Sequence, residues 1–197
     1  MSKRIKFFLG HLAISLLIAL IAIAIVFFVW YPAPLASAEG VMTIFLMLVV
    51  IDVIVGPLLS LLVYKEGKKT LKMDLGVIVL LQLSALAYGV FNIAEGRPVW
   101  LAYNVDRFEL VRNNEILTEQ IAQASPQYQQ PSWFKPQFVG VEFAKDKKVR
   151  SDDMLAEVLG GFSIAQRPER YVPLDKVKNQ IQQHAQTIEI LNQFNDK

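Results

Sequence analysis

Cysteine is absent from the 197-residue sequence, and histidine occurs only twice. Without a thiol, the chain can form no disulfide, no cysteine-ligated metal centre and no cysteine nucleophile. The sequence also lacks the glycine-rich phosphate-binding motifs and the G-x-S-x-G nucleophile motif. We therefore expect a protein that is not an enzyme and holds no metal or cofactor. A hydrolase would need an active site built from carboxylates alone.

Charged residues are scarce in the first half of the chain. Residues 1–95 hold 7 Lys/Arg and 5 Asp/Glu, whereas residues 96–197 hold 13 of each. This split excludes a wholly soluble protein, a disordered chain and a disulfide-stapled scaffold. The second half has an ordinary soluble composition without a net positive charge, which argues against a nucleic-acid partner.

Three long apolar runs predict three transmembrane helices, at residues 7–30, 41–64 and 75–94. At about 1.5 Å per residue, roughly 20 residues cross the roughly 30 Å hydrocarbon core of a bilayer. The first run is longer than the hydrophobic part of a secretory signal peptide, which has about 7–15 residues. We therefore expect it to remain, although residues 36–38 (Ala-Ser-Ala) resemble a cleavage site. Residues 1–95 are thus predicted to form a three-span membrane domain.

Positive charge flanks these runs unevenly. Residues 31–40 contain no Lys or Arg. The other short flanking segments contain Lys3, Arg4, Lys6, Lys65, Lys68, Lys69 and Lys72. Because cytoplasmic loops retain positive charge, we expect the N-terminus and residues 65–74 in the cytoplasm and residues 96–197 on the opposite side.

Ring side chains near the ends of the runs are interpreted as interfacial anchors. These are Trp30, Tyr31, Tyr64 and Trp100. We interpret His11, near the inner end of the first run, as interfacial too. In this topology a histidine-based site in the outer domain would depend on His184 alone, and we expect His184 to lie on a solvated face of a polar helical stretch.

Residues 96–197 predict one small α/β or α+β domain, and the pattern does not choose between the two. Strands are expected within 99–111 and 137–144, where β-branched and aromatic residues alternate with polar ones. Helices are expected over 115–124, from an N-cap at Ser151 to the glycines at 160–161, and from residue 174 onward. Asp152 and Asp153 would then lie in the first helical turn. The predicted fold class is therefore a three-helix membrane domain followed by a small mixed α/β domain.

Asp52 is an acidic residue near the middle of the second apolar run. A carboxyl group at that depth costs roughly 2.5–3.5 kcal/mol on insertion scales, and such groups normally face protein or water. Two interpretations stay open. Asp52 bonds within the bundle to Gln82, Ser84 or Tyr88, or it meets a polar or cationic group on another membrane helix.

Gly56, Pro57 and Ser60 extend the face of Asp52, because residues four apart share one side of a helix. Glycine permits close approach of another backbone, and proline removes a backbone donor and kinks the helix. This face is therefore either a docking surface for a partner helix or a device that packs the three spans together.

The chain as a whole resembles the type IV pilin accessory proteins of the TfpX/TfpZ type. The resemblance rests on three spans, an acid followed by Gly-Pro in the second, and an exported domain of about 100 residues. Its local marks are IDVIVGPL at 51–58, AYNVDRF at 102–108, Gly160-Gly161 and RPERYVPL at 167–174.

The resemblance implies a multi-pass protein of the Gram-negative inner membrane with its C-terminal domain in the periplasm. It implies an accessory factor or chaperone that binds the major pilin before or during assembly. The expected partners are the type IV major pilin, membrane lipid and the pilus assembly machinery. The rival classes are a membrane sensor or ligand-binding protein, an anchored hydrolase and a structural subunit of an envelope complex.

From this resemblance we hypothesise two contact regions for the pilin. The intramembrane region is the face formed by Asp52, Gly56, Pro57 and Ser60. The outer region comprises Arg107, Arg167, Arg170 and Tyr171. In the alternative interpretation, the three arginines pair with Asp106 and Glu169 and help the domain to fold.

Overall fold

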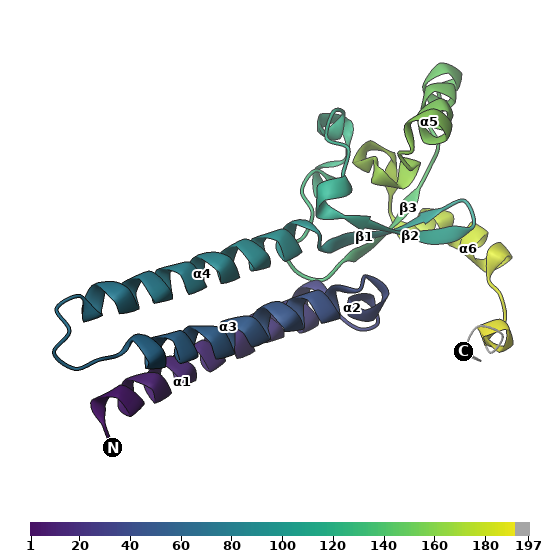
Figure 1. Ribbon diagram of the computed structural model, residues 1–197. Helices are drawn as coiled ribbons and strands as arrows, with labels where there is room; N and C mark the ends of the chain where they lie inside the picture. The colour runs from purple at the N-terminus through teal and green to yellow at the C-terminus, as the bar shows by residue number, and fades with distance from the viewer. Residues whose placement is uncertain (192–197) are drawn as a thin grey trace. The chain divides into compact units, whose positions relative to one another are not determined.

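The structure is a computed structural model that describes residues 1–191. It divides into two compact units with the boundary between Arg97 and Pro98. The first unit is helical and the second contains a small sheet with helices (Figure 1). The predicted fold class, three long apolar helices followed by a mixed α/β domain, is confirmed.

The first unit contains the helices that the apolar runs predict. α1 (Lys3–Ala24) continues as a π-helical segment (Ile25–Trp30), and α3 (Val41–Val63) and α4 (Leu71–Glu95) follow. A short helix, α2 (Leu35–Ala38), connects the first two. Within residues 1–191, three helices are long and apolar enough to cross a membrane. The chain is therefore a multi-pass membrane protein.

α3 is the central helix of this unit, because it packs against both α1 and α4. Its buried side chains Phe45 and Val49 form a core with Ala19 and Val26 of the first span. Tyr31 is buried in the same core and donates a hydrogen bond from its hydroxyl to the carbonyl of Ile93 (3.0 Å). Tyr31 is thus a packing residue as well as a residue near the end of a span.

The second unit is built on a four-stranded sheet within residues 98–191, in the order β2-β1-β3-β4. The strands are β1 (Pro98–Asn104), β2 (Arg107–Arg112), β3 (Gln137–Val141) and β4 (Tyr171–Val172). β1 pairs antiparallel with β2 and parallel with β3, and β3 pairs antiparallel with β4. The strands expected within 99–111 and 137–144 are confirmed.

Trp100 is completely buried in the core of this second unit. Its ring packs edge-on against Tyr128 (centroids 5.8 Å apart) and Tyr171 (5.4 Å). The interpretation of Trp100 as an interfacial anchor is therefore wrong. The sequence shows only the position of Trp100 just after a span. Because Trp100 lies in β1, its side chain points into the core of the sheet domain instead of to the membrane interface.

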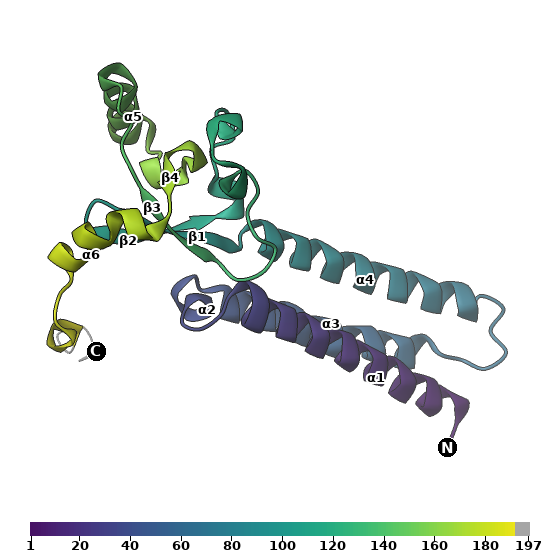
Figure 2. The same ribbon diagram turned by 180° about the vertical axis from the view of Figure 1, so that it is seen from behind.

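α5 (Lys147–Gly160) begins one turn before the predicted N-cap at Ser151. The side chain of Asp146 caps it by accepting hydrogen bonds from the backbone N–H groups of Lys148 (2.9 Å) and Val149 (3.0 Å). Asp153 therefore lies in the middle of the helix and not in its first turn. In both views α5 extends away from the sheet (Figures 1 and 2).

The helix predicted over 115–124 is wrong, because this segment forms only the 3-10 turns Asn113–Glu115 and Ile121–Gln123. Between them the N–H of Leu117 donates to the carbonyl of Gln166 (2.9 Å), so tertiary pairing replaces a helical bond. The final predicted helix is interrupted as well. Its α-helical part is α6 (Lys178–His184), preceded by the 3-10 turn Leu174–Val177.

Candidate partner-binding site

A cluster of polar side chains lies inside the apolar helix bundle. α1 contributes His11 and Ser15, α3 contributes Asp52 and Ser60, and α4 contributes Gln82. All except Gln82 are buried, with Asp52 only 9% exposed. Polar groups in a bilayer core are costly unless they find hydrogen-bond partners, so these side chains converge.

Gln82 is the hub of this cluster. Its Nε2 donates to Ser15 Oγ (2.9 Å) and to the main-chain carbonyl of Asp52 (3.1 Å). Its Oε1 lies 3.0 Å from His11 Nε2. One amide side chain therefore ties all three spans together. The predicted bond between Asp52 and Gln82 is present, at 3.4 Å from Nε2 to Oδ2.

His11 is a member of this cluster and not an interfacial residue, which corrects the interpretation from its position in the sequence. Its Nδ1 lies 3.0 Å from Ser60 Oγ and its Nε2 3.0 Å from Gln82 Oε1. Because a carboxamide oxygen only accepts hydrogen bonds, His11 Nε2 carries a proton in this arrangement. The signal that sequence reasoning missed is the joint presence of Ser15, Ser60 and Gln82 as possible partners.

Gly56, Pro57 and Ser60 are buried against the other two spans. A Cβ atom on Gly56 would lie 1.9 Å from Gln82 Oε1, so glycine leaves the space that the amide occupies. The Ser60 hydroxyl donates to the carbonyl of Pro57 (2.8 Å). In the isolated chain this part of the face packs the three spans together, which is one of the two interpretations left open by the sequence.

The carboxylate of Asp52 accepts only one long side-chain hydrogen bond within the described residues 1–191. Gln82 Nε2 carries two hydrogens but lies near three acceptors, and the carboxylate oxygen is the farthest of the three. At 3.4 Å this contact is longer than the roughly 2.7–3.2 Å of ordinary N–H···O bonds. Among residues 1–191, Gln82 is the one side chain whose hydrogen bond to this carboxylate is seen.

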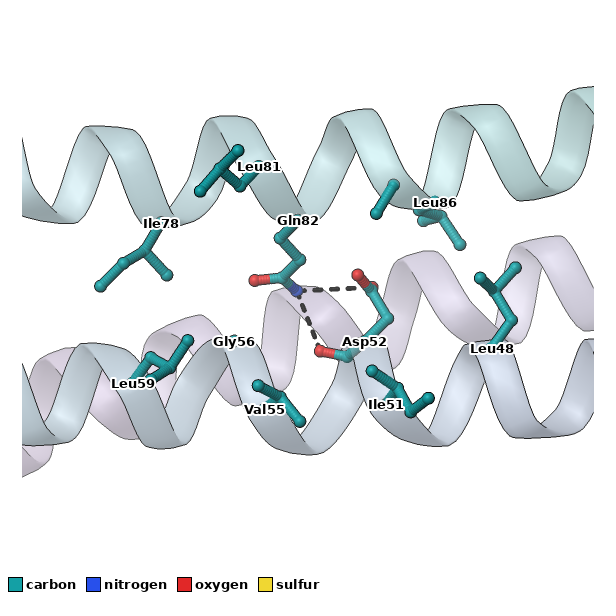
Figure 3. Close-up of a pocket in the computed structure, with 11 residues that line it drawn as sticks. Leu48, Ile51, Asp52, Val55, Gly56, Leu59, Ile78, Leu81, Gln82 and Leu86 are labelled. Carbon is teal, nitrogen blue, oxygen red and sulfur yellow. Dashed lines mark hydrogen bonds between the residues drawn. The ribbon is translucent and has the colours of Figure 1, made fainter.

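The side chain of Asp52 borders a groove of about 210 Å³ between α3 and α4. Figure 3 shows Asp52 and Gln82 pointing toward one another between the two helices, with apolar side chains on either side. The lining residues are Leu48, Ile51, Asp52, Val55, Gly56, Leu59, Ile78, Leu81, Gln82, Ala85 and Leu86. The groove thus combines apolar walls with a single acidic group.

The outer candidate residues do not form one surface. Arg107 is exposed, with 71% of its side chain accessible, and pairs with Asp106 (Nε to Oδ1 3.0 Å). Arg167 and Arg170 are mostly buried and both contact Asp153, at 3.7 and 2.8 Å. Arg167 also pairs with Glu169, as the alternative interpretation expected (3.5 Å).

Tyr171 lies in the core of the second unit. Its hydroxyl donates to the carbonyl of Ala165 (2.5 Å). Burial raises the pKa of this phenol above its ordinary value, and the nearby carboxylates of Glu169 and Glu109 raise it further. The side chain is a structural element of the domain in this conformation.

Among residues 1–191, no group of three or more His, Asp or Glu side chains is arranged to hold a metal ion. His184 lies at the end of α6, exposed, with Nδ1 2.9 Å from the carbonyl of Gln180 and 3.2 Å from the hydroxyl of Tyr103. The polar chemistry of the described chain is therefore concentrated in the intramembrane cluster and in the ion pairs of the outer domain.

Three comparisons with known proteins bear on this arrangement. A family model described as "Fimbrial assembly protein FimB" matches residues 1–40. The "Fimbrial assembly protein, serogroup E1" of Dichelobacter nodosus is 31% identical over 188 residues, covering 92% of this chain and 73% of that protein. The "serogroup I" protein of the same organism gives the same figures. No solved structure matches the chain.

The fold and the site together define a multi-pass membrane protein with a polar cluster in its helix bundle and a small mixed α/β domain that follows the third span in the sequence. The extent and level of the similarity identify its family. The chain belongs to the fimbrial assembly protein family.

Proposed function

We propose that this protein acts in the assembly of type IV fimbriae as an inner-membrane accessory factor or chaperone for the pilin subunit. It binds the pilin before or during assembly and affects its stability or its delivery to the surface. Membership of the fimbrial assembly protein family supports the role in fimbrial assembly. The resemblance to the TfpX/TfpZ accessory proteins supports the pilin as the direct partner.

The observation that carries this proposal is the apolar groove between α3 and α4 with the carboxylate of Asp52 at its edge. Its walls suit an apolar transmembrane helix, because helices in lipid associate through close packing and interhelical hydrogen bonds. Among residues 1–191 the carboxylate has only the long contact with Gln82 (3.4 Å), so a donor on a partner helix would complete its hydrogen bonding. A lipid acyl chain could occupy the apolar groove, but it has no hydrogen-bond donor for the carboxylate of Asp52.

A pilin before assembly provides the matching group. The resemblance implies a partner with a single hydrophobic helix, a glutamate near its mature amino end and a head outside the membrane. Asp52 would accept a hydrogen bond from the protonated glutamate or pair with the terminal amine. Either contact would complete the hydrogen bonding of Asp52 inside the bilayer.

In the outer domain, Arg107 is the candidate for contact with the pilin head. Its guanidinium is exposed, and among residues 1–191 its one ion pair is with the neighbouring Asp106 at the surface, so exchanging that pair for a partner's carboxylate costs little. Arg167, Arg170 and Tyr171 support this surface indirectly by holding the domain together.

Co-purification of the pilin with Asp52 variants tests the intramembrane contact. We expect Asp52→Leu to remove most of the co-purified pilin, and Asp52→Asn to reduce it. Asp74→Asn is the matched control, because Asp74 lies at the start of α4 beside Lys68 and away from the groove. If both Asp52 variants accumulate normally and retain the pilin, the intramembrane contact is refuted.

A further inference from the structure

α5 is an amphipathic helix whose apolar side faces outward. Leu155, Val158 and Leu159 follow the spacing i, i+3 and i+4, which places them on one side of the helix axis. With Met154 beside them, these side chains are 42–81% exposed. We call these four residues of α5 the α5 stripe.

The polar side of the same helix is fixed to the domain. Asp153 is the buried residue of α5 and accepts two hydrogen bonds from the guanidinium of Arg170, at 2.8 and 3.3 Å. The guanidinium of Arg150 lies over the ring of Phe143, 4.9 Å from its centre. An ordinary surface helix buries its apolar side and exposes its polar side. α5 does the reverse.

The ion pairs of Asp153 fix the orientation of α5 about its own axis. Rotating α5 to bury the stripe would leave Asp153 without its partners and the mostly buried Arg170 without the carboxylate of Asp153. Breaking a buried ion pair in this way is strongly destabilising. The stripe is therefore held outward, and exposed contiguous apolar surface of this kind marks an interaction site.

Two features identify what covers the stripe. Exposed lysines stand at the start of α5, namely Lys145, Lys147 and Lys148. Lys147 and Lys148 lie in the first turn, where positive charge opposes the helix dipole, so they do not serve helix stability. Beside an apolar stripe, they complement the phosphates of anionic lipid.

The second feature is the short linker that joins the third membrane span to the outer domain. α4 ends at Glu95 and β1 begins at Pro98, so two residues separate a membrane-spanning helix from the sheet. Even fully extended, such a linker spans only about 10 Å. The domain is therefore held beside the lipid surface at high effective concentration.

We propose that α5 is an interfacial helix that lies on the surface of the bilayer. The stripe enters the boundary between headgroups and acyl chains, and the lysines at its start bind anionic headgroups. This contact would fix the orientation of the outer domain at the membrane and requires no pilin, so it is independent of the proposed function.

The absence of cysteine from the chain permits a direct test with the full-length protein. V158C and E157C, neighbours on the apolar and polar sides of α5, are each labelled with an environment-sensitive fluorophore. Each protein is reconstituted into vesicles of phosphatidylethanolamine and phosphatidylglycerol without pilin. We expect the label at 158 to be quenched by lipid carrying a spin label in its acyl chain and to be protected several-fold from aqueous iodide. The label at 157 should stay accessible to iodide.

The second measurement tests whether the protection of position 158 depends on the lysines at the start of α5. Replacing Lys147 and Lys148 together by Glu, or the anionic lipid by phosphatidylcholine, should increase iodide access at 158. Equal iodide quenching at 157 and 158 together with no quenching by spin-labelled lipid would overturn the proposal. Protection at 158 that disappears on dilution of the protein in lipid would overturn it too, because it would identify a second copy as the occupant.

Discussion

At the scale of single residues, Gln82 and Gly56 explain how a polar cluster is accommodated in an apolar bundle. The carboxamide reaches side chains on α1 and α3 only because the residue opposite it has no Cβ. Its two donated hydrogens go preferentially to Ser15 and to the main chain of α3, which leaves the carboxylate of Asp52 with a long contact. The same arrangement therefore holds the amide of Gln82 in place and leaves the carboxylate of Asp52 available to a further donor.

Gly56→Ala should therefore destabilise the bundle. The added methyl group would displace the amide of Gln82 and break its bonds to His11 and Ser15, at a cost of about 1–3 kcal/mol in the free energy of unfolding. The intrinsic gain in helix propensity is at most about 1 kcal/mol. Thermal unfolding in detergent measures the difference. Gly76→Ala is the control, since a Cβ there meets nothing within 4 Å; equal stability of both variants would contradict this role.

Tyr171 gives the outer domain an alkaline limit. In the folded state burial raises the pKa of its phenol, whereas in the unfolded chain it ionises near its ordinary value of about 10. The stabilisation is therefore complete below about pH 10 and is lost as the pH rises further. Tyr171→Phe should cost about 1–2 kcal/mol near neutral pH and weaken the alkaline loss.

Fluorescence of the full chain in detergent follows this transition, because Trp100 packs against Tyr171. Tyr88→Phe serves as the control, since Tyr88 is exposed. An unchanged alkaline transition in the Tyr171 variant would show that another group sets the limit.

At the scale of elements, the sequence predicts the membrane helices well and the outer helices poorly. Long apolar runs have one stable form in lipid, so the three spans follow from composition. The segment at 115–124 has helical spacing, yet Leu117 pairs with Gln166, which is distant in the sequence. The sequence pattern predicts the start of α5 at Ser151, whereas the side chain of Asp146 caps the helix one turn earlier.

In the candidate site, too, most contacts that depend on tertiary packing could not be predicted from the sequence. Asp52 and its bond to Gln82 could be predicted, because an acid in a span requires a partner and few polar residues are near. The part played by His11 could not, since it depends on the rotation of α1 against α3. Likewise, the acidic pair at 152–153 was assigned to a helix start, whereas the buried pairing of Asp153 with Arg170 is a tertiary contact.

Asp153→Ala should release α5 from the domain. The substitution leaves the mostly buried Arg170 without the carboxylate of Asp153 and Arg167 with Glu169 alone, and the expected loss in the free energy of unfolding is about 3–5 kcal/mol. Hydrogen exchange along residues 147–160 of the full chain measures the protection of the helix. The neighbouring Asp152→Ala, at an exposed position, should leave protection unchanged. Equal protection in both variants would show that the ion pair does not hold the helix.

At the scale of the whole molecule, the proposed function requires the two units to act on opposite parts of one pilin. The helix bundle would hold the transmembrane helix, and the outer domain would face the head. This arrangement requires the outer domain to lie in the periplasm, as the distribution of lysines between the short loops predicts.

A fusion of alkaline phosphatase behind Lys197 tests this orientation, because the enzyme is active only after export. We expect high activity from this fusion and low activity from the same enzyme inserted at Gly67, between α3 and α4. Activity only at the second position would place the outer domain in the cytoplasm and remove the basis for contact with the pilin head.

The most direct test of the central claim is site-specific photocrosslinking from the groove in cells that make the pilin. Ile51 and Val50 are both 54% exposed, but Ile51 lines the groove between α3 and α4 and Val50 does not. A photoreactive amino acid at position 51 should give a crosslink to the pilin helix that Asp52→Leu abolishes, and the same group at position 50 should give little. Crosslinks of equal strength from both positions, or none to the pilin from position 51, would contradict the account.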